Sequence, residues 1–449
     1  MKIGLAIASF GLVLSLPLHE IRAIPLPESV ARGFLGHFVA KDSEIVDMMD
    51  ETMKAAFGAA KAAQFADSLV AKGGTFIGLG ESKIETKDDY SVVLIRGNYE
   101  KMSLDFKVTV DQKGLVAGFF VSNLAPKAEW TLPPYAKAGV WKDEEVEVGA
   151  AGWPLKGTLS IPSGKEPFPA VLLVQGSGPS DRDEAVGPNK IFADIAAGLA
   201  TDGIAVLRYD KRTLVYASEM AKSAETIGVG EETVDDAVAA LAFLAKDGRI
   251  DGKHIFIIGH SLGAMLGPKI AAEAQARGIA IAGLVLLAPS ASPLEDVIVD
   301  QFNYLAKSGA GGEDLGAAEL SRIEAAAERV KALTSLPSQE DPAPALLPLG
   351  IPASWWRSIA GYDPVKAARE LALPLLVIHG SRDYQVGLAE AALWKKGLSG
   401  IKTAKVVLID GLNHLMMKGK GPSTPSEYDK PGHVDGRVIG QIAGFLFTR

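Results

Sequence analysis

Hydrophobic and polar positions follow two different periods in the first part of the chain. From Glu28 to Gly73 the apolar residues recur at intervals of three and four, which predicts amphipathic helices that end at a glycine pair. From Thr75 to Leu124 apolar and polar residues alternate, and turn-forming stretches such as "DQKG" interrupt them, which predicts antiparallel strands. Helices followed by an antiparallel meander predict a small α+β domain over residues 28–128.

The pattern changes again after a proline-containing segment at residues 129–141, which we interpret as a linker. Continuous apolar runs such as "PAVLLVQG", "GIAVLRYD" and "HIFIIGH" then alternate with helical stretches. Strands that are buried on both faces are typical of parallel sheets covered by helices. The alternation pauses at about residues 291–371, where the pattern predicts a helical cap over the carboxyl ends of the strands. We therefore predict an α/β fold with a mostly parallel, doubly wound sheet over residues 142–449.

The first residues have the pattern of a secretory signal peptide. One lysine precedes an apolar run from Ile3 to about Leu18, and a cleavage site can be placed after Ala23. An uncleaved anchor is the alternative, but the run is shorter than the roughly 20 apolar residues that cross a bilayer. We expect residues 1–23 to be a signal peptide. The mature protein is then secreted or periplasmic, with no stable membrane insertion.

Composition and charge narrow the range of partners and chemistry. The 449 residues are 48% hydrophobic and 22% charged, which is typical of a folded globular protein. The net charge of −8 and the lack of a basic run argue against nucleic acid as a partner. The absence of cysteine excludes disulfides, thiolate metal sites and a cysteine nucleophile. We expect no metal and no organic cofactor.

The stretch "GHSLG" contains the candidate nucleophile, Ser261. It fits the pattern G-x-S-x-G, which is short and weak by itself. Here an apolar strand pattern precedes it and a helical pattern follows, as the strand–turn–helix arrangement of a nucleophile elbow requires. A serine hydroxyl is a poor nucleophile at neutral pH, so Ser261 needs a base and an acid that orients the base.

The order serine, acid, histidine that accompanies such an elbow selects the partners. His414 lies in a loop directly after the last predicted strand, and we prefer it to His433, which we expect to be a surface or capping residue. Asp383 lies in the loop after the preceding strand, and we prefer it to Asp410, which is close to the histidine in sequence. The other histidines lie in the leader, in the small domain, at a strand start, inside the elbow, or ahead of the proposed acid: His19, His37, His254, His260 and His379.

The reaction also needs two backbone amides that stabilise the oxyanion. The amide of Leu262, next to the nucleophile, is one candidate. The other should come from "QGSGPSDRD", and we choose Ser177, with Gly176 as the adjacent candidate. This stretch lacks the lysine and the glycine spacing of phosphate-binding loops.

Two further motifs lie near the predicted site. We call the stretch "QGSGPSDRD", residues 175–183, the oxyanion loop. In "LRYDKR" we expect Asp210 and Arg212 to pair with groups such as Asp181 or Asp183 and so fix this loop. The tryptophans of "SWW" at residues 354–356 lie in the predicted cap. They either line an acyl pocket or pack in the core of the cap, and the sequence leaves both open.

Together these motifs resemble the bacterial serine carboxylesterases of the α/β-hydrolase superfamily that carry a small α+β domain of unassigned function at the amino end. "QGSGPSDRD", "RYDKR", "GHSLG", "GSRDYQV" and "NHL" occur in one order across Glu144–Arg449. The resemblance implies the α/β-hydrolase fold, with Ser261, Asp383 and His414 as the triad. Ala264 stands where this superfamily commonly has a second glycine, and alanine fits at a helix start. The first domain resembles a cystatin-like module, which implies association or substrate gating.

The sequence is compatible with three functions that experiments can distinguish. The first is a serine carboxylesterase that hydrolyses short-to-medium acyl esters, small and neutral or weakly charged, through an acyl-enzyme. The second is an amidase or serine aminopeptidase of the same fold, because the fold leaves the scissile bond open. The third is a non-catalytic binding protein, whose expected mark is the loss of a triad member. The sequence identifies neither the natural ester nor the oligomeric state, and a homo-oligomer is one of the states that it allows.

Overall fold

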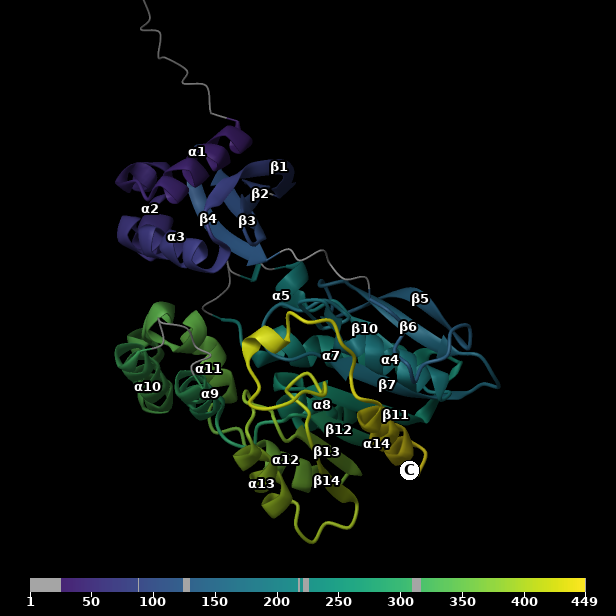
Figure 1. The fold of residues 1–449 in the computed structure, drawn as a ribbon. Helices are drawn as coiled ribbons and strands as arrows, with labels where there is room; N and C mark the ends of the chain where they lie inside the picture. The colour runs from purple at the N-terminus through teal and green to yellow at the C-terminus, as the bar shows by residue number, and fades with distance from the viewer. Residues whose placement is uncertain are drawn as a thin grey trace, which may run out of the picture. The chain divides into compact units, whose positions relative to one another are not determined.

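The protein forms two compact units, residues 1–127 and 128–449, which we describe separately (Figure 1). The computed structural model describes residues 26–87, 89–123, 130–216, 219–220, 226–308 and 316–448. The predicted signal peptide, residues 1–23, lies outside the described residues.

In the first unit, helices pack on one face of an antiparallel sheet. The helical part contains α1 (Pro27–Ala40), η1 (Ser43–Met48), α2 (Glu51–Ala56) and α3 (Ala59–Gly73). The strands are β1 (Phe76–Lys87), β2 (Tyr90–Tyr99), β3 (Ser103–Asp111) and β4 (Val116–Asn123), in the order β1-β2-β3-β4. Alternate residues of β3, from Leu104 to Val110, are buried, as the period of two predicts. An aromatic cluster that includes Phe38, Phe106 and Phe119 fills the core between the layers. The predicted small antiparallel α+β domain is confirmed.

The second unit contains an eight-stranded sheet in the order β14-β13-β12-β11-β7-β10-β6-β5 (Figure 1). Its strands are β5 (Trp141–Val148), β6 (Leu155–Pro162), β7 (Phe168–Val174), β10 (Ala205–Tyr209), β11 (Ile250–His260), β12 (Gly283–Leu287), β13 (Leu375–Gly380) and β14 (Ala404–Ile409). The pairs β5–β6 and β6–β10 are antiparallel, and all other pairs of this sheet are parallel. A separate small hairpin joins β8 (Ala185–Val186) to β9 (Asn189–Lys190).

Helices cover both faces of this sheet, because its central strands are apolar on both sides. In β7, Leu172 and Val174 belong to one apolar cluster, whereas Val171 and Leu173 belong to another. The first cluster includes residues of α7 (Asp235–Lys246), α8 (Leu262–Ala276) and α13 (Leu388–Gly397). The second includes residues of α4 (Ile191–Thr201) and α14 (Gly436–Leu446). The predicted doubly wound α/β-hydrolase fold is confirmed.

The helical insertion lies between β12 and β13. It contains α9 (Leu294–Ser308), α10 (Ala317–Ala332), α11 (Ala353–Ile359) and α12 (Pro364–Leu371), with the short turns η3 (Leu333–Ser335), η4 (Ser338–Glu340), η5 (Pro344–Leu346) and η6 (Pro348–Gly350). Arg357 of α11 donates to the carbonyl of Leu333 at 2.6 Å and to that of Leu336 at 3.0 Å, so α11 is tied to the end of α10. Trp355 and Trp356 are buried within the apolar core, which favours the packing alternative.

Three short elements complete the second unit. α5 (Arg212–Val215) follows β10, η2 (Gly230–Val234) precedes α7, and η7 (Pro425–Glu427) lies between β14 and α14. Both α5 and η2 lie in the connection that follows the carboxyl end of β10, where open α/β sheets form their sites.

We expected residues 129–141 to be a linker between the domains. The described part of this segment, from residue 130 onward, instead belongs to the second unit. The indole of Trp130 donates to Asp194 at 2.8 Å, and the ring of Tyr135 packs against the apolar core. Turns at residues 134–135 and 138–139 bend this segment, and its aromatic side chains gain free energy by burial against α4.

Candidate active site

Ser261 lies in a sharp turn between β11 and α8. Its φ of 52° and ψ of −117° are strained for a residue with a side chain. The Ser261 amide donates to the Leu287 carbonyl at 2.9 Å, which anchors the turn to the neighbouring strand. A Cβ on Gly263 would lie 2.3 Å from the carbonyl oxygen of Val174, and one on Gly259 would lie 2.3 Å from that of Gly263. Only glycine allows this close approach of the backbones, so the glycines of the motif are explained.

Asp383 and His414 are in direct contact. Nδ1 of His414 lies 2.8 Å from Oδ2 of Asp383, and both side chains are buried. The other carboxylate oxygen accepts the amides of Gln385 and Val386 at 2.9 Å each, so the carboxylate is held from both sides. A carboxylate at Nδ1 selects the tautomer in which Nε2 is free to accept a proton.

The loop of His414 is held next to the elbow. Nε2 of His260 lies 3.0 Å from the His414 carbonyl oxygen, and the two imidazole centroids are 4.7 Å apart. His260 directly precedes Ser261, so these contacts bring the predicted base and nucleophile to the same place. Among the described contacts there is no hydrogen bond between the Ser261 hydroxyl and the His414 ring. Such bonds often tighten only when substrate binds.

The two competing residues lie in other surroundings. Nδ1 of His433 is 3.1 Å from a carboxylate oxygen of Asp194, which also accepts the Trp130 indole. Asp410 accepts the hydroxyl of Ser381 at 2.9 Å. Neither residue contacts the pair of Asp383 and His414, so these two remain the preferred acid and base.

The candidate oxyanion donors differ in their availability. The amide of Gly176 donates to Oε1 of Glu184 at 2.6 Å, so it is already engaged. A Cβ on Gly176 would lie 3.1 Å from the Cβ of Ser261, which shows that this loop lies against the elbow. Leu262 begins α8, where amides have no acceptor within the helix. The described contacts include no acceptor for the amides of Ser177 or Leu262, so these two remain the candidate oxyanion donors, whereas the amide of Gly176 is already occupied.

A second acid–histidine pair, absent from the sequence prediction, lies behind the elbow. Nδ1 of His260 is 3.0 Å from Oε1 of Glu184, and both residues are buried. Burial disfavours the imidazolium, but the Glu184 carboxylate, together with the His414 carbonyl and the Asp383 charge, outweighs it and raises the pKa of His260 above its ordinary value. Both ring nitrogens face oxygen acceptors, and only the cation donates to both. This pair joins the oxyanion loop, the elbow and the His414 loop.

The ion pairs beside the loop correct part of the sequence prediction. Asp210 does fix the oxyanion loop, but its partner is Arg182, which donates to both carboxylate oxygens at 3.1 and 2.8 Å. Arg212 does not pair with the loop. It donates to Asp236 of α7 at 2.8 Å, in a fully buried pair. Asp210 and Arg212 are two residues apart, yet they pair with a loop and with a helix that are distant from each other in sequence, so sequence proximity does not decide which partner each reaches.

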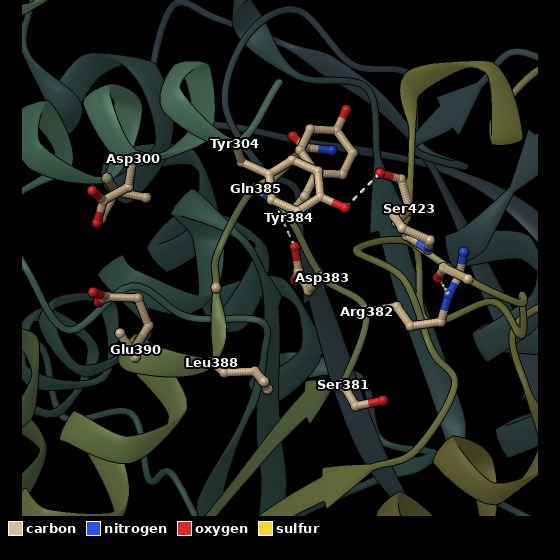
Figure 2. A pocket seen from close by; sticks show the side chains of 15 residues that line it. Asp300, Tyr304, Ser381, Arg382, Asp383, Tyr384, Gln385, Leu388, Glu390 and Ser423 are labelled. Carbon is tan, nitrogen blue, oxygen red and sulfur yellow. Dashed lines mark hydrogen bonds between the residues drawn. The ribbon is translucent and has the colours of Figure 1, made fainter. Parts of the chain in front are cut away.

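A cavity of about 480 Å³ adjoins the acid of the pair. Figure 2 shows Tyr304 and Tyr384 side by side within it, with Asp383 below them. The two tyrosine rings stack with centroids 5.4 Å apart. Neither Ser261 nor His414 lines this cavity, so it does not contain the predicted nucleophile or base.

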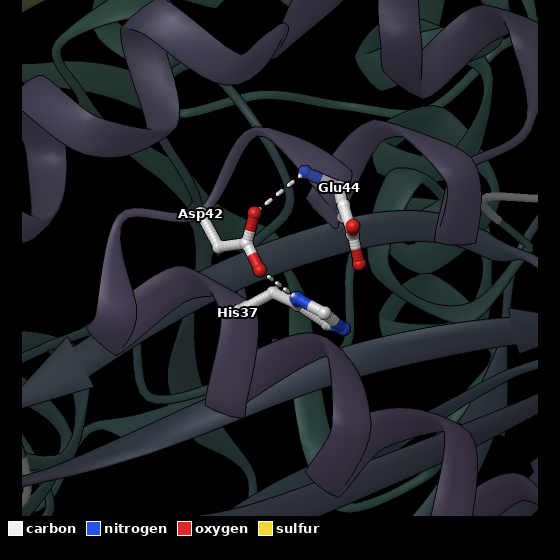
Figure 3. A group of neighbouring side chains, drawn as sticks. All are labelled: His37, Asp42 and Glu44. Atoms are coloured by element: carbon white, nitrogen blue, oxygen red, sulfur yellow. Dashed lines mark hydrogen bonds and ion pairs between the residues drawn. The ribbon is translucent and has the colours of Figure 1, made fainter.

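A cluster of possible metal ligands occurs in the first unit (Figure 3). Nδ1 of His37 lies 2.9 Å from Asp42, whose other oxygen accepts the Glu44 amide at 3.0 Å. The Glu44 amide, and then His37, lower the pKa of Asp42. These bonds join the end of α1 to the start of η1, and this structural role explains the cluster, so we assign no metal to it.

Comparisons with known proteins agree with this description. The family of proteins of unknown function DUF3887 matches residues 31–119, and the alpha/beta hydrolase family matches residues 171–426. The chain is 38% identical to the esterase EstD of Thermotoga maritima over 414 residues, which are 92% of this chain and 93% of that protein.

Solved structures are similar at lower identity. Est1E from Butyrivibrio proteoclasticus is 18% identical, with 68% of this chain and 98% of that one covered and a TM-score of 0.44. A puromycin-hydrolyzing peptidase of Mycobacterium tuberculosis is 16% identical, with 83% and 48% covered and a TM-score of 0.43. The sequence matches are decisive: the chain belongs to the alpha/beta hydrolase family and is a homologue of an esterase.

Proposed function

We propose that this protein is a serine carboxylesterase that hydrolyses short-to-medium acyl esters through an acyl-enzyme. The buried contact of 2.8 Å between Asp383 and His414, beside a strained serine elbow, carries the proposal. Ser261 is the nucleophile, and the amides of Ser177 and Leu262 hold the oxyanion. The name of EstD, which is similar over nearly the whole chain, supports an ester rather than an amide substrate.

Each proposed group has one task in the reaction. Ser261 Oγ attacks the ester carbonyl while Nε2 of His414 takes its proton. Asp383 stabilises the imidazolium that forms, because its carboxylate is buried and already oriented by two backbone amides. The imidazolium then gives its proton to the leaving alcohol. Water repeats the sequence on the acyl-enzyme and releases the acid.

The first experiment is labelling with a fluorophosphonate probe, combined with hydrolysis of p-nitrophenyl acetate, butyrate and octanoate. The wild-type protein should be labelled and should turn over the esters, and Ser261→Ala should lose both. Ser68→Ala removes a helix hydroxyl whose one described hydrogen bond is to the Phe65 carbonyl; it is the matched control and should keep both. An Ser261→Ala protein that keeps full esterase activity would contradict the mechanism.

The other functions appear as outcomes of the same experiment. Faster turnover of aminoacyl anilides than of acyl esters would favour the amidase or aminopeptidase. A wild-type protein that is neither labelled nor active would favour the non-catalytic binding protein, although all three triad residues are present in the sequence.

We also propose export to the periplasm or the medium, directed by the leader at residues 1–23. Among the helices that the structure describes, none has the length and apolarity to cross a membrane. Cell fractionation with amino-terminal sequencing tests the proposal. Full-length protein in the cytoplasm, with its first residues intact, would contradict it.

A further inference from the structure

Lys211 is a buried cation that the proposed reaction does not use. It directly follows the Asp210 that pairs with the oxyanion loop, and its side chain is 2% exposed. Its Nζ donates to the Gly176 carbonyl at 2.8 Å and to Oε1 of Glu232 at 2.6 Å. A buried ammonium is costly unless it is paired, and Glu232 supplies the charge partner. The charge pairing with Glu232 does not require the contact between Lys211 and the Gly176 carbonyl, so this contact needs a separate explanation.

The planarity of the peptide supplies that reason. The Gly176 carbonyl and the Ser177 amide belong to one peptide group, which is trans. In a planar trans peptide, the C=O and N–H bonds point in opposite directions. When Lys211 holds the Gly176 oxygen, it also fixes the direction of the Ser177 N–H. The positive charge at the oxygen further polarises the group and strengthens that N–H as a donor.

Both peptide groups of Gly176 are held in this way. Its amide donates to Glu184 on one side, and its carbonyl accepts from Lys211 on the other. The backbone at this glycine therefore cannot rotate about either peptide without breaking a bond to a buried charged side chain. Ser177, which follows, is exposed and has no such partner of its own among the described contacts.

We infer that Lys211 is a positioning residue that aims the Ser177 amide at the oxyanion, and that the cap holds Lys211 in place. The inference rests on the proposed function. Glu232, in the π-helical turn η2, bonds to Lys211 through one oxygen and accepts the indole N–H of Trp355 through the other. Trp355 belongs to α11 of the insertion. A chain of three hydrogen bonds thus links the cap to the oxyanion loop.

A neighbouring ion pair provides a matched control. Arg212 and Asp236 are as deeply buried as Lys211 and Glu232, with exposures of 4% and 1%, but they make no described contact with the oxyanion loop. If Lys211 acts only through stability, then removal of either pair should have the same effect on the reaction. If Lys211 aims an amide, then only its own pair should matter.

The test compares an acyl trifluoromethyl ketone with the matching trifluoromethyl carbinol as inhibitors of ester hydrolysis. Ser261 Oγ adds to the ketone carbon, the carbonyl π electrons move to the oxygen, and the serine proton passes to His414. The product places an alkoxide at the Ser177 and Leu262 amides. The carbinol has similar shape but no carbonyl, so the ratio of the two inhibition constants measures stabilisation of the oxyanion.

The variants are Lys211→Met with Glu232→Gln, and Arg212→Met with Asp236→Asn. Both charges of a pair are removed together, so no buried charge is left alone. Loss of one oxyanion donor costs about 100- to 1000-fold in kcat, and a misdirected donor should cost about 10- to 100-fold. We expect the Lys211 variant to lose this factor in kcat and in the inhibitor ratio with KM nearly unchanged, and the Arg212 variant to keep its ratio.

Trp355→Phe is the milder variant, because it keeps an aromatic ring at this position, leaves both charges in place and removes one hydrogen bond. It should lower the inhibitor ratio in the same direction by a smaller factor. An unchanged ratio in both the Lys211 and Trp355 variants, or an equal loss in the Arg212 variant, would overturn the inference. If the wild-type protein does not prefer the ketone and Ser261→Ala changes nothing, the proposed function itself fails.

Discussion

Acid should destabilise the second unit through one buried histidine, His379. It lies on β13 with 1% of its surface exposed, and neither of its ring nitrogens has a hydrogen-bond partner within the described residues. Burial lowers the pKa of His379 from 6.5 to about 4, since the imidazolium has no counter-charge strong enough to offset its loss of water. The folded protein therefore keeps this ring neutral at a pH where the unfolded chain protonates it.

The sign and size of the effect follow from linkage. Between pH 6.5 and about 4 the unfolded state binds the proton and the folded state does not, so stability falls as the pH falls. Each pH unit in this window costs about 1.4 kcal/mol, so the total loss is about 3 kcal/mol. The stabilising contribution of the neutral ring is complete above pH 6.5 and is lost as the pH falls through the folded pKa.

Tryptophan fluorescence during urea denaturation measures this loss. All six tryptophans lie in the second unit, so the signal reports on that unit alone: Trp130, Trp141, Trp153, Trp355, Trp356 and Trp394. The wild-type protein and His379→Leu are compared at pH 7 and pH 4.5, because paired carboxylates lose stability in both proteins and cancel. The wild-type protein should lose about 2 to 3 kcal/mol more than the variant over this range. Equal losses in both proteins would refute the reasoning.

Three further substitutions and one control variant test the site. Asp383→Asn presents an amide N–H to His414 where a carboxylate stood, so kcat for p-nitrophenyl butyrate should fall on the order of 10⁴-fold with little change in the urea midpoint. A fall below tenfold would contradict the assigned acid. Gly263→Ala puts a Cβ 2.3 Å from a carbonyl oxygen of β7, so it should lower the free energy of unfolding by at least about 2 kcal/mol and remove most of the activity. Ala264→Gly, its control, should lower the free energy of unfolding by about 1 kcal/mol and keep the activity. Glu184→Gln removes the charge that the Gly176 amide and the His260 ring share, so the free energy of unfolding in urea should fall by about 2 kcal/mol. An unchanged urea midpoint would refute the bridging role of Glu184.

The sequence by itself determined the parts of this protein that depend on local pattern. The change from a period of three and four to a period of two, and then to continuous apolar runs, predicted both units and the doubly wound sheet. Each period reflects which faces of a helix or strand must be buried, and that requirement is local. The strained turn at Ser261 was also recognisable, because such an elbow needs small residues at fixed positions on either side of it.

Only the tertiary structure decided which side chains meet. The spacing of Asp383 and His414 allowed their pairing, but their contact depends on neighbouring parallel strands that end at one edge of the sheet. Arg212 and Lys211 are adjacent in sequence, and they bond to different elements of the unit. The sequence pattern could not assign these partners, because each donor has many acids within reach along the chain. Burial leaves only the one that the packed helices and strands bring to hydrogen-bond distance, and this choice is a property of the whole fold.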